Sequence, residues 1–201
     1  MYNNVRRVNF LVYNLYSPYA EYIKNLTNYL GGYSHGVNGL KTVLFVCTGN
    51  TCRSSMAEAI FKDMLKNTKK GKDSINVLSA GISAVEGESA SRYAIQVMSE
   101  QGIDLTCHRA KLLTLEMVNK ADFILTMTSG HKMAVMVMYP NAHGKTFTLK
   151  EYARRMNKNS INDGYSNLDI PDPYGQSIEV YRQCAKQIKQ EIIKIIDRLD
   201  L

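Results

Sequence analysis

Residues 42–58 read TVLFVCTGNTCRSSMAE, and this stretch predicts a strand, a loop and a helix in direct succession. The apolar run at its start is typical of a buried parallel strand, because such strands are covered on both faces. Gly49 and Asn50 then suit a loop with unusual backbone angles. Ser55 and Glu58 match a capping box, so we expect a helix to begin there.

The loop has the composition of a cradle for a phosphoryl group. Cys47 and Arg53 flank five residues, and the peptide N–H groups of residues 48–53 can all point at one tetrahedral anion. Arg53 can add a planar fork to two of the anion's oxygens. The residues expected to bind phosphate are Thr48, Gly49, Asn50, Thr51, Cys52, Arg53 and Ser54.

Cys47 is the expected nucleophile of this loop. The helix N-terminus, the Arg53 guanidinium and the Ser54 hydroxyl should together lower its pKa and favour the thiolate. The thiolate would attack phosphorus in line and form a cysteinyl-phosphate intermediate. A chance match with an inert, buried cysteine is the alternative, and the strand–loop–helix context argues against it. Because arginine and loop amides can stabilise the transferred charge, we expect neither a metal nor a cofactor.

The proton for the leaving group is expected from Asp172, in the segment DIPDPYG at residues 169–175. Two prolines stiffen this segment and can hold the carboxyl group over the cradle. In a second step the same carboxylate would activate water against the cysteinyl-phosphate. Asp172 could instead be an ordinary turn residue, since Asp-Pro is common in turns. Asp169 is a weaker candidate for the same role.

The loop sequence VCTGNTCRS together with the distant DPYG, residues 172–175, resembles the low-molecular-weight protein tyrosine phosphatase family. The likeness runs from about Lys41 to the C-terminus. Further family signatures are SAG at 79–81, ADFILTM at 121–127 and FTLKEY at 147–152. More specifically, the chain is similar to the bacterial branch that includes protein-arginine phosphatases. The resemblance implies that Asn50 braces the loop through Ser79. Ser55 stands where the family usually has proline, and a serine can cap the helix instead.

The rest of the chain alternates between strand and helix patterns. Strands are expected at 43–46, 74–79, 123–127 and 145–149, and helices after the loop, at 88–101, at 130–138 and from 177 onward. This alternation predicts an α/β fold of three layers, in which a central four-stranded parallel sheet is flanked by helices. Ligands of such sheets bind beyond the carboxyl ends of the strands. Cys47 ends the first strand, so the motif and the fold predict the same site.

We expect a phosphatase domain over residues 41–201, preceded by an N-terminal extension of residues 1–40. Within the extension, residues 17–30 begin with serine and proline, are followed by glycine, and carry apolar side chains at helical spacing. This segment is therefore a candidate amphipathic helix. The other interpretation is that translation starts near Lys41, which would make the extension an artefact of the assigned start.

Composition and charge narrow the functional classes further. A net charge of +7 can attract phosphorylated protein substrates, but no nucleic-acid motif accompanies it, so nucleic acid is not an expected partner. The apolar segments are too short to span a membrane, and no membrane partner is expected. Four cysteines in 201 residues form no secreted disulfide framework, and a thiolate nucleophile indicates the reducing cytoplasm. The sequence leaves the oligomeric state open, with a monomer as the simplest expectation.

Thr51 and Tyr174 are the expected specificity residues. Family members that act on tyrosine usually carry a larger aliphatic residue in place of Thr51, whereas the arginine phosphatases resemble this chain in carrying threonine. An aliphatic wall packs a flat phenol ring, while a smaller hydroxyl leaves room for a guanidinium. Tyr174 would stack on either substrate. We therefore expect a protein phosphoarginine phosphatase, with protein phosphotyrosine as the alternative substrate.

Two other functions are weaker alternatives. Arsenate reductase uses a similar loop but needs further cysteines just after the third strand, and residues 122–138 contain none. A phosphoprotein-binding module without catalysis would lack the nucleophile or the acid, whereas both Cys47 and Asp172 are present. Cys52 is either a packing residue or a redox partner of Cys47, because the two share one curled loop and a low-pKa thiolate oxidises readily.

Overall fold

The computed structural model describes residues 41–66, 75–155 and 167–197. Within these residues, four parallel strands form one sheet in the order β2-β1-β3-β4. The strands are β1 (Lys41–Cys47), β2 (Ile75–Gly81), β3 (Phe123–Thr126) and β4 (Thr146–Thr148). Cys47 pairs with Gly81 of β2, and Val46 pairs with Thr126 of β3. The carboxyl ends of these three strands therefore meet at one edge of the sheet.

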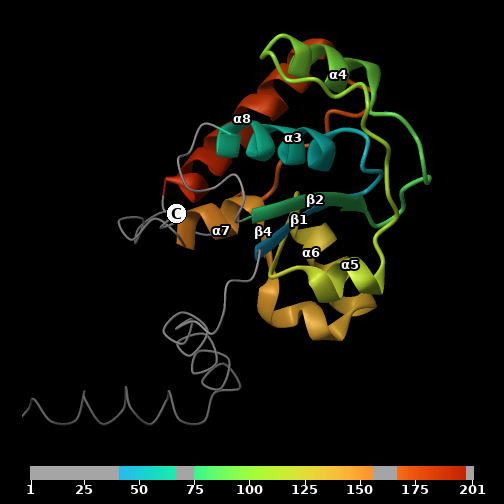
Figure 1. Ribbon diagram of the computed structural model, residues 1–201, viewed down its shortest axis with the longest axis vertical. Helices are drawn as coiled ribbons and strands as arrows, with labels where there is room; N and C mark the ends of the chain where they lie inside the picture. The colour runs from blue at the N-terminus through green and yellow to red at the C-terminus, as the bar shows by residue number, and fades with distance from the viewer. Residues whose placement is uncertain (1–40, 67–74, 156–166, 198–201) are drawn as a thin grey trace, which may run out of the picture. The chain divides into compact units, whose positions relative to one another are not determined.

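Helices cover both faces of the sheet (Figure 1). One face carries α3 (Arg53–Lys66), α4 (Arg92–Ser99), α7 (Leu149–Arg155) and α8 (Ile178–Ile196). The other face carries α5 (Leu115–Lys120), α6 (Ser129–Met138) and the 3-10 helix η1 (Pro140–Lys145). The expected three-layer α/β fold with a four-stranded parallel sheet is confirmed. None of the helices in the described ranges has the length and hydropathy that crossing a membrane requires.

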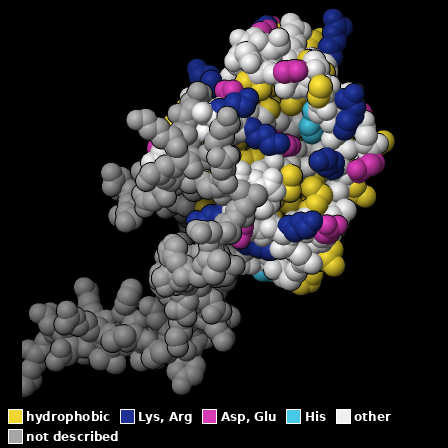
Figure 2. Space-filling model, viewed as in Figure 1, with side chains coloured by type: hydrophobic (Ala, Val, Ile, Leu, Met, Phe, Trp, Pro, Cys, Tyr) yellow, Lys and Arg dark blue, Asp and Glu magenta, His cyan; other side chains and the backbone are white. Residues whose placement is uncertain are grey.

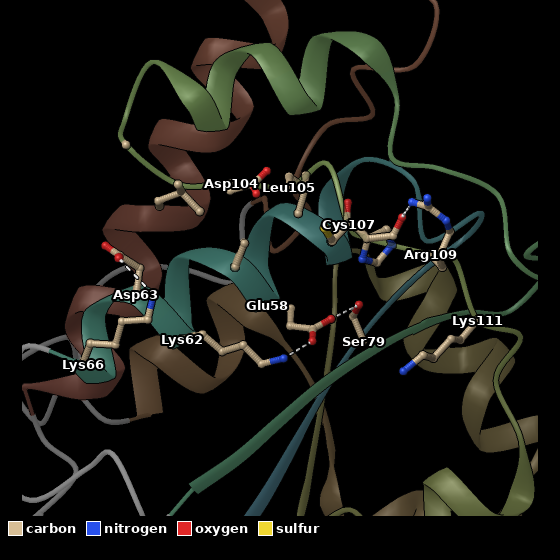
Figure 3. Close-up of a pocket in the computed structure, with 15 residues that line it drawn as sticks. Glu58, Lys62, Asp63, Lys66, Ser79, Asp104, Leu105, Cys107, Arg109 and Lys111 are labelled. Atoms are coloured by element: carbon tan, nitrogen blue, oxygen red, sulfur yellow. Dashed lines mark hydrogen bonds and ion pairs between the residues drawn. The ribbon is translucent and has the colours of Figure 1, made fainter.

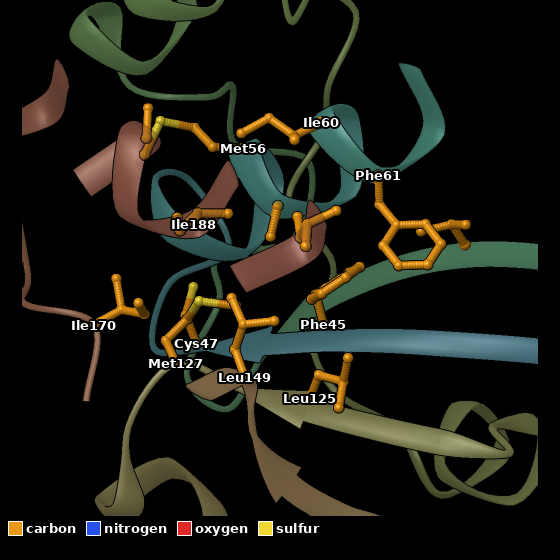
Figure 4. Packing of buried hydrophobic residues seen from close by; sticks show 14 of the residues in the cluster. Phe45, Cys47, Met56, Ile60, Phe61, Leu125, Met127, Leu149, Ile170 and Ile188 are labelled. Carbon is orange, nitrogen blue, oxygen red and sulfur yellow. The ribbon is translucent and has the colours of Figure 1, made fainter. Parts of the chain in front are cut away.

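Strand β1 supplies side chains to both halves of the core. Val43 and Phe45 belong to the cluster that packs against α3 and α8, whereas Leu44 and Val46 belong to the cluster on the α5 and α6 side. Phe45 packs against Phe61 of α3 with ring centroids 5.7 Å apart (Figure 4). Burial of one such side chain stabilises the fold by roughly 1.5–3 kcal/mol. Because both faces are buried, the strand is an unbroken apolar run in the sequence.

The helix after the loop begins earlier than the sequence predicts. Helix α3 starts at Arg53, so Ser55 already lies in its first turn. The Ser55 hydroxyl donates to the Cys52 carbonyl, and the Glu58 carboxylate accepts from the Ser79 hydroxyl of β2. The capping-box interpretation of Ser55 and Glu58 is therefore wrong, because both side chains serve other partners.

Other boundaries also differ from expectation. The helix expected at 88–101 begins only at Arg92, behind the capping Ser91, and residues 82–91 form a loop instead. The short helices α5 and α7 were not predicted, because six or seven residues give too little periodicity to recognise. The extension at 1–40, the candidate helix at 17–30 within it and the end of the last expected helix lie outside the described residues.

Candidate active site

Asn50 holds the loop between β1 and α3 in shape. Its backbone is left-handed, with φ at 57°, a conformation that asparagine tolerates better than most residues. Its side-chain amide donates to the Ser54 and Ser79 hydroxyl oxygens, at 2.8 Å each. Its Oδ1 accepts the Lys111 N–H at 2.9 Å. Asn50 thereby joins the loop to α3, to β2 and to the chain after α4, and the contact with Ser79 that the family resemblance implies is present.

The end of β2 approaches this loop so closely that only glycine fits at position 81. A Cβ built on Gly81 would lie 2.4 Å from the Thr48 carbonyl oxygen and 2.9 Å from the Asn50 nitrogen. Just beyond, the Ser83 N–H donates to the Thr48 carbonyl at 2.9 Å. The backbone of the loop is thus packed directly against the backbone that follows β2.

Cys47 is buried at the base of the loop. Its Sγ lies 2.9 Å from the Ser54 Oγ and 3.3 Å from the Asn50 nitrogen. Burial raises the pKa of the Cys47 thiol, while hydrogen bonds from Ser54 and Asn50 and the charge of Arg53 act to lower it. The sequence predicted a net lowering of this pKa, and that prediction is wrong for the free site, because desolvation of the sulfur is the larger effect.

Arg53 and Asp172 form an ion pair across the site. The Arg53 Nη2 lies 2.5 Å from the Asp172 Oδ2, and Nη1 donates to the Ile170 carbonyl at 3.2 Å. The Arg53 side chain is only 5% exposed, whereas that of Asp172 is 50% exposed. Among the described residues, the Arg53 Nε is the one buried side-chain nitrogen or oxygen without a hydrogen-bond partner. This guanidinium therefore has a donor available for a ligand.

The predicted site residues converge on a cavity of about 240 Å³. Its lining comprises Cys47, Thr48, Gly49, Thr51, Cys52, Arg53, Glu88, Asp172 and Tyr174. Asn50 and Ser54 are buried behind this lining and support it. Tyr174 is 74% exposed, so its ring stands at the rim of the cavity. Glu88 was not predicted, because no motif surrounds it and a single surface acid in a loop carries no sequence signal.

Asp169, the weaker candidate for the acid, and Cys52, the candidate redox partner of Cys47, each have defined partners in the structure. The Asp169 carboxylate accepts the Ser129 N–H and hydroxyl at 2.7 and 2.9 Å, so it caps α6 and does not line the cavity. Cys52 is a free thiol whose Sγ lies 3.3 Å from the Ser91 Oγ and 3.4 Å from the Tyr181 hydroxyl. Its disulfide with Cys47 stays a prediction.

A larger cavity of about 570 Å³ lies behind the loop, between α3 and the chain after α4 (Figure 3). Within it, Glu58 accepts from both Lys62 and the Ser79 hydroxyl, and the His108 Nε2 lies 2.7 Å from the Asn50 carbonyl oxygen. The side chains around this cavity therefore support the phosphate-binding loop from behind.

On the face of the molecule shown in Figure 2, basic side chains are interspersed with acidic and apolar ones. No three metal-binding side chains gather anywhere in the described ranges.

Comparison with known proteins agrees with this geometry. Residues 42–201 match the model of the low molecular weight phosphotyrosine protein phosphatase family. The chain belongs to this family. The match begins one residue after Lys41, where the resemblance was expected to begin.

Curated members of the family cover the same part of the chain. A protein-arginine-phosphatase of Geobacillus stearothermophilus is 43% identical over 157 residues, which are 78% of this chain and 95% of the relative. The protein-arginine-phosphatase of Bacillus subtilis is 36% identical over the same shares. The probable low molecular weight protein-tyrosine-phosphatase EpsP of Ralstonia solanacearum is 33% identical over 80% of this chain and 97% of its own.

Solved structures of the family share the fold. The YwlE arginine phosphatase from Geobacillus stearothermophilus has a TM-score of 0.67 at 40% identity, covering 79% of this chain and 92% of its own. The low molecular weight protein tyrosine phosphatase from T. tengcongensis has a TM-score of 0.69 at 42% identity, covering 79% and 99%. The similarity to the family, including its arginine-phosphatase branch, is therefore confirmed in sequence and in structure.

Proposed function

We propose that this protein hydrolyses phosphoarginine in proteins through a cysteinyl-phosphate intermediate, without a metal ion. The observation that carries the proposal is the convergence of a buried thiol, a buried guanidinium and a carboxylate in one cavity. Cys47 and Arg53 lie at the two ends of one loop and Asp172 lies in a distant segment, yet all three line the cavity. The relatives named protein-arginine-phosphatase support the choice of substrate.

In the first step, the N–H groups of residues 48–53 and the Arg53 guanidinium hold the phosphoryl oxygens. The Cys47 thiolate, stabilised by the Ser54 hydroxyl, attacks phosphorus, and an S–P bond forms as the P–N bond of phosphoarginine breaks. The phosphoryl oxygens replace Asp172 as partners of Arg53. The released Asp172 carboxylate takes up the proton that the Cys47 thiol loses on forming the thiolate, and it donates this proton to the departing guanidine nitrogen.

In the second step, the Asp172 carboxylate takes a proton from water as the water oxygen attacks phosphorus. The S–P bond breaks, inorganic phosphate leaves and Cys47 returns to the thiolate. The half-exposed position of Asp172 suits both steps, because the carboxyl group must reach first the leaving group and then a solvent molecule. Once Asp172 has passed its proton to the Cys47 sulfur, the Arg53–Asp172 ion pair seen in the free site can form again.

The walls of the cavity favour a cationic substrate. Thr51 presents a small hydroxyl side chain where an aliphatic wall would pack a ring. Glu88 and Asp172 add two carboxylates, which complement a guanidinium better than a phenol. Phosphotyrosine is the second candidate, because Tyr174 at the rim can stack on a phenol ring and relatives such as EpsP are named tyrosine phosphatases.

The test compares two peptides of one sequence, one with phosphoarginine and one with phosphotyrosine. We expect the unaltered protein to have the higher kcat/KM for the phosphoarginine peptide, in buffer containing a metal chelator. Thr51→Ile should move the ratio of the two kcat/KM values toward phosphotyrosine by about tenfold. The reason is that about one methylene group more or less in a pocket changes the discrimination between two substrates by roughly 1–3 kcal/mol. A preference of the unaltered protein for phosphotyrosine would replace the arginine assignment by the second candidate.

We further propose that the enzyme works in the cytoplasm and that oxidation can join Cys47 to Cys52. Both cysteines are free thiols that line the cavity, and the nucleophile works only while it stays reduced. Peroxide, as the two-electron oxidant, should inactivate the enzyme, and dithiothreitol should restore it. Mass spectrometry of the oxidised protein should find the Cys47–Cys52 disulfide; irreversible loss of activity without that bond would contradict the proposal.

A further inference from the structure

His131 connects the phosphate-binding loop to helix α6. Its side chain is buried, at 7% exposure, in the first turn of this helix. The ring Nε2 lies 2.8 Å from the Thr48 Oγ1, and the ring Nδ1 lies 2.8 Å from the Thr128 Oγ1. Thr128 is the N-cap of α6 and also accepts the backbone N–H of His131 at 3.1 Å. The imidazole therefore bridges the cap of α6 and the first residue of the loop.

The same turn of α6 also holds the segment that carries the acid. The Asp169 carboxylate accepts both donors of Ser129, at 2.7 and 2.9 Å. Next to it, the Ile170 N–H donates to the Met127 carbonyl at 2.8 Å, just before α6 begins. Asp172 follows two residues after Ile170. One helix turn is thus bonded both to the loop of the nucleophile and to the chain of the acid.

We propose that His131 is a positioning residue, which acts through Thr48 to fix the nucleophile loop relative to the acid segment. The proposal rests on the phosphatase function proposed above. Thr48 follows Cys47 directly and has two anchors outside the loop: the His131 ring on its side chain and the Ser83 N–H on its carbonyl. Removal of the ring contact leaves Thr48 with only the bond from the Ser83 N–H. The Cys47 sulfur and the Asp172 carboxyl group are then no longer both positioned by α6.

A neutral imidazole suits this position. Burial and the Arg53 guanidinium lower the pKa of His131 to about 4, against the opposing effect of the Asp172 and Asp169 carboxylates. The ring is therefore uncharged at neutral pH, with one nitrogen donating and the other accepting. His131 therefore adds no second positive charge beside Arg53, whose own charge remains available to the phosphoryl group.

Two amide variants separate the two bonds of the ring. His131→Gln places an amide group where Nε2 lies and can keep the bond to Thr48, whereas His131→Asn mimics Nδ1 and can keep only the bond to Thr128. We expect His131→Asn to lower kcat for nitrophenyl phosphate about tenfold, or ~1.4 kcal/mol in the barrier, and His131→Gln to stay within about threefold. His143→Ala, at an exposed histidine of η1, is the matched control and should leave kcat unchanged.

Thr48→Val supplies a test that does not depend on the stability of the helix, because Thr48 lies on the surface of the loop. It should lower kcat about as much as His131→Asn, with little change in Tm. The double variant should lose no more than either single one, since both remove the same bond. A wild-type kcat in His131→Asn or in Thr48→Val, or fully additive losses, would overturn the positioning role. An unaltered protein without turnover would instead refute the phosphatase function.

Discussion

Replacement of Gly81 by alanine tests whether the close approach of β2 sets the geometry of the phosphate-binding loop. The new Cβ would stand 2.4 Å from the Thr48 carbonyl oxygen, 2.9 Å from the Asn50 nitrogen and 3.0 Å from the Ala84 Cβ. A carbon and a carbonyl oxygen normally approach to about 3.3 Å. The two nearest atoms belong to the loop backbone, so neither can turn aside as a flexible side chain would. The loop must therefore move by about 0.9 Å, which follows from 3.3 − 2.4.

The size of this shift gives the expected loss of activity. A displacement of about 1 Å at a reacting centre can lower turnover about a hundredfold, which is ~2.7 kcal/mol in the barrier. Overpacking of this kind also lowers the free energy of unfolding by about 1–3 kcal/mol. We expect the loss of turnover to exceed what the loss of folded protein explains, because the atoms displaced belong to Thr48 and Asn50.

The assay measures kcat for nitrophenyl phosphate, the dissociation constant of vanadate by calorimetry, and Tm for the same preparation. Gly144→Ala is the matched control, since a Cβ there meets no heavy atom within 4 Å and the backbone needs no positive φ. Gly81→Ala should weaken vanadate binding as well as turnover. If it keeps kcat within twofold of the unaltered protein, the loop is not held by β2 and the reasoning fails.

Three further variants or conditions test the site. Cys47→Ser should abolish turnover while vanadate still binds, because the loop amides and Arg53 remain. Calorimetry measures the vanadate binding beside the activity assay, and residual turnover would contradict the role of Cys47. Asp172→Ala should lower kcat by about 10²–10⁴ for substrates with poor leaving groups and much less for nitrophenyl phosphate; a series of aryl phosphates measures this, and an equal loss throughout would exclude the acid role. The free energy of unfolding should fall between pH 6.5 and 4 by on the order of 2 kcal/mol, because His131 protonates in the unfolded chain but not in the folded one. Urea unfolding of the unaltered protein and of His131→Gln should show this difference, and parallel pH curves would contradict it.

Much of the candidate site could be predicted from local patterns. The run before Cys47, the glycine and asparagine of the loop and the arginine at its end lie within twelve residues, so chain connectivity alone brings them together. Asp172 lies 119 residues from Arg53, and its place could be expected only from its stiff segment and from the family resemblance. In the structure, Cys47, Gly49, Arg53 and Asp172 line one cavity, and Asn50 is buried behind it.

The sequence alone also determined the class of fold, because strand and helix patterns alternate and each strand is apolar enough to be buried on both faces. Tertiary structure decided what depends on neighbours distant along the chain. It placed Glu88 in the wall of the cavity, joined His131 to Thr48 across 83 residues, and made Asp169 a cap of α6. It also reversed the expected pKa shift of Cys47. Local donors and charges can be read from the residues around a sulfur, but desolvation depends on every segment that packs over it.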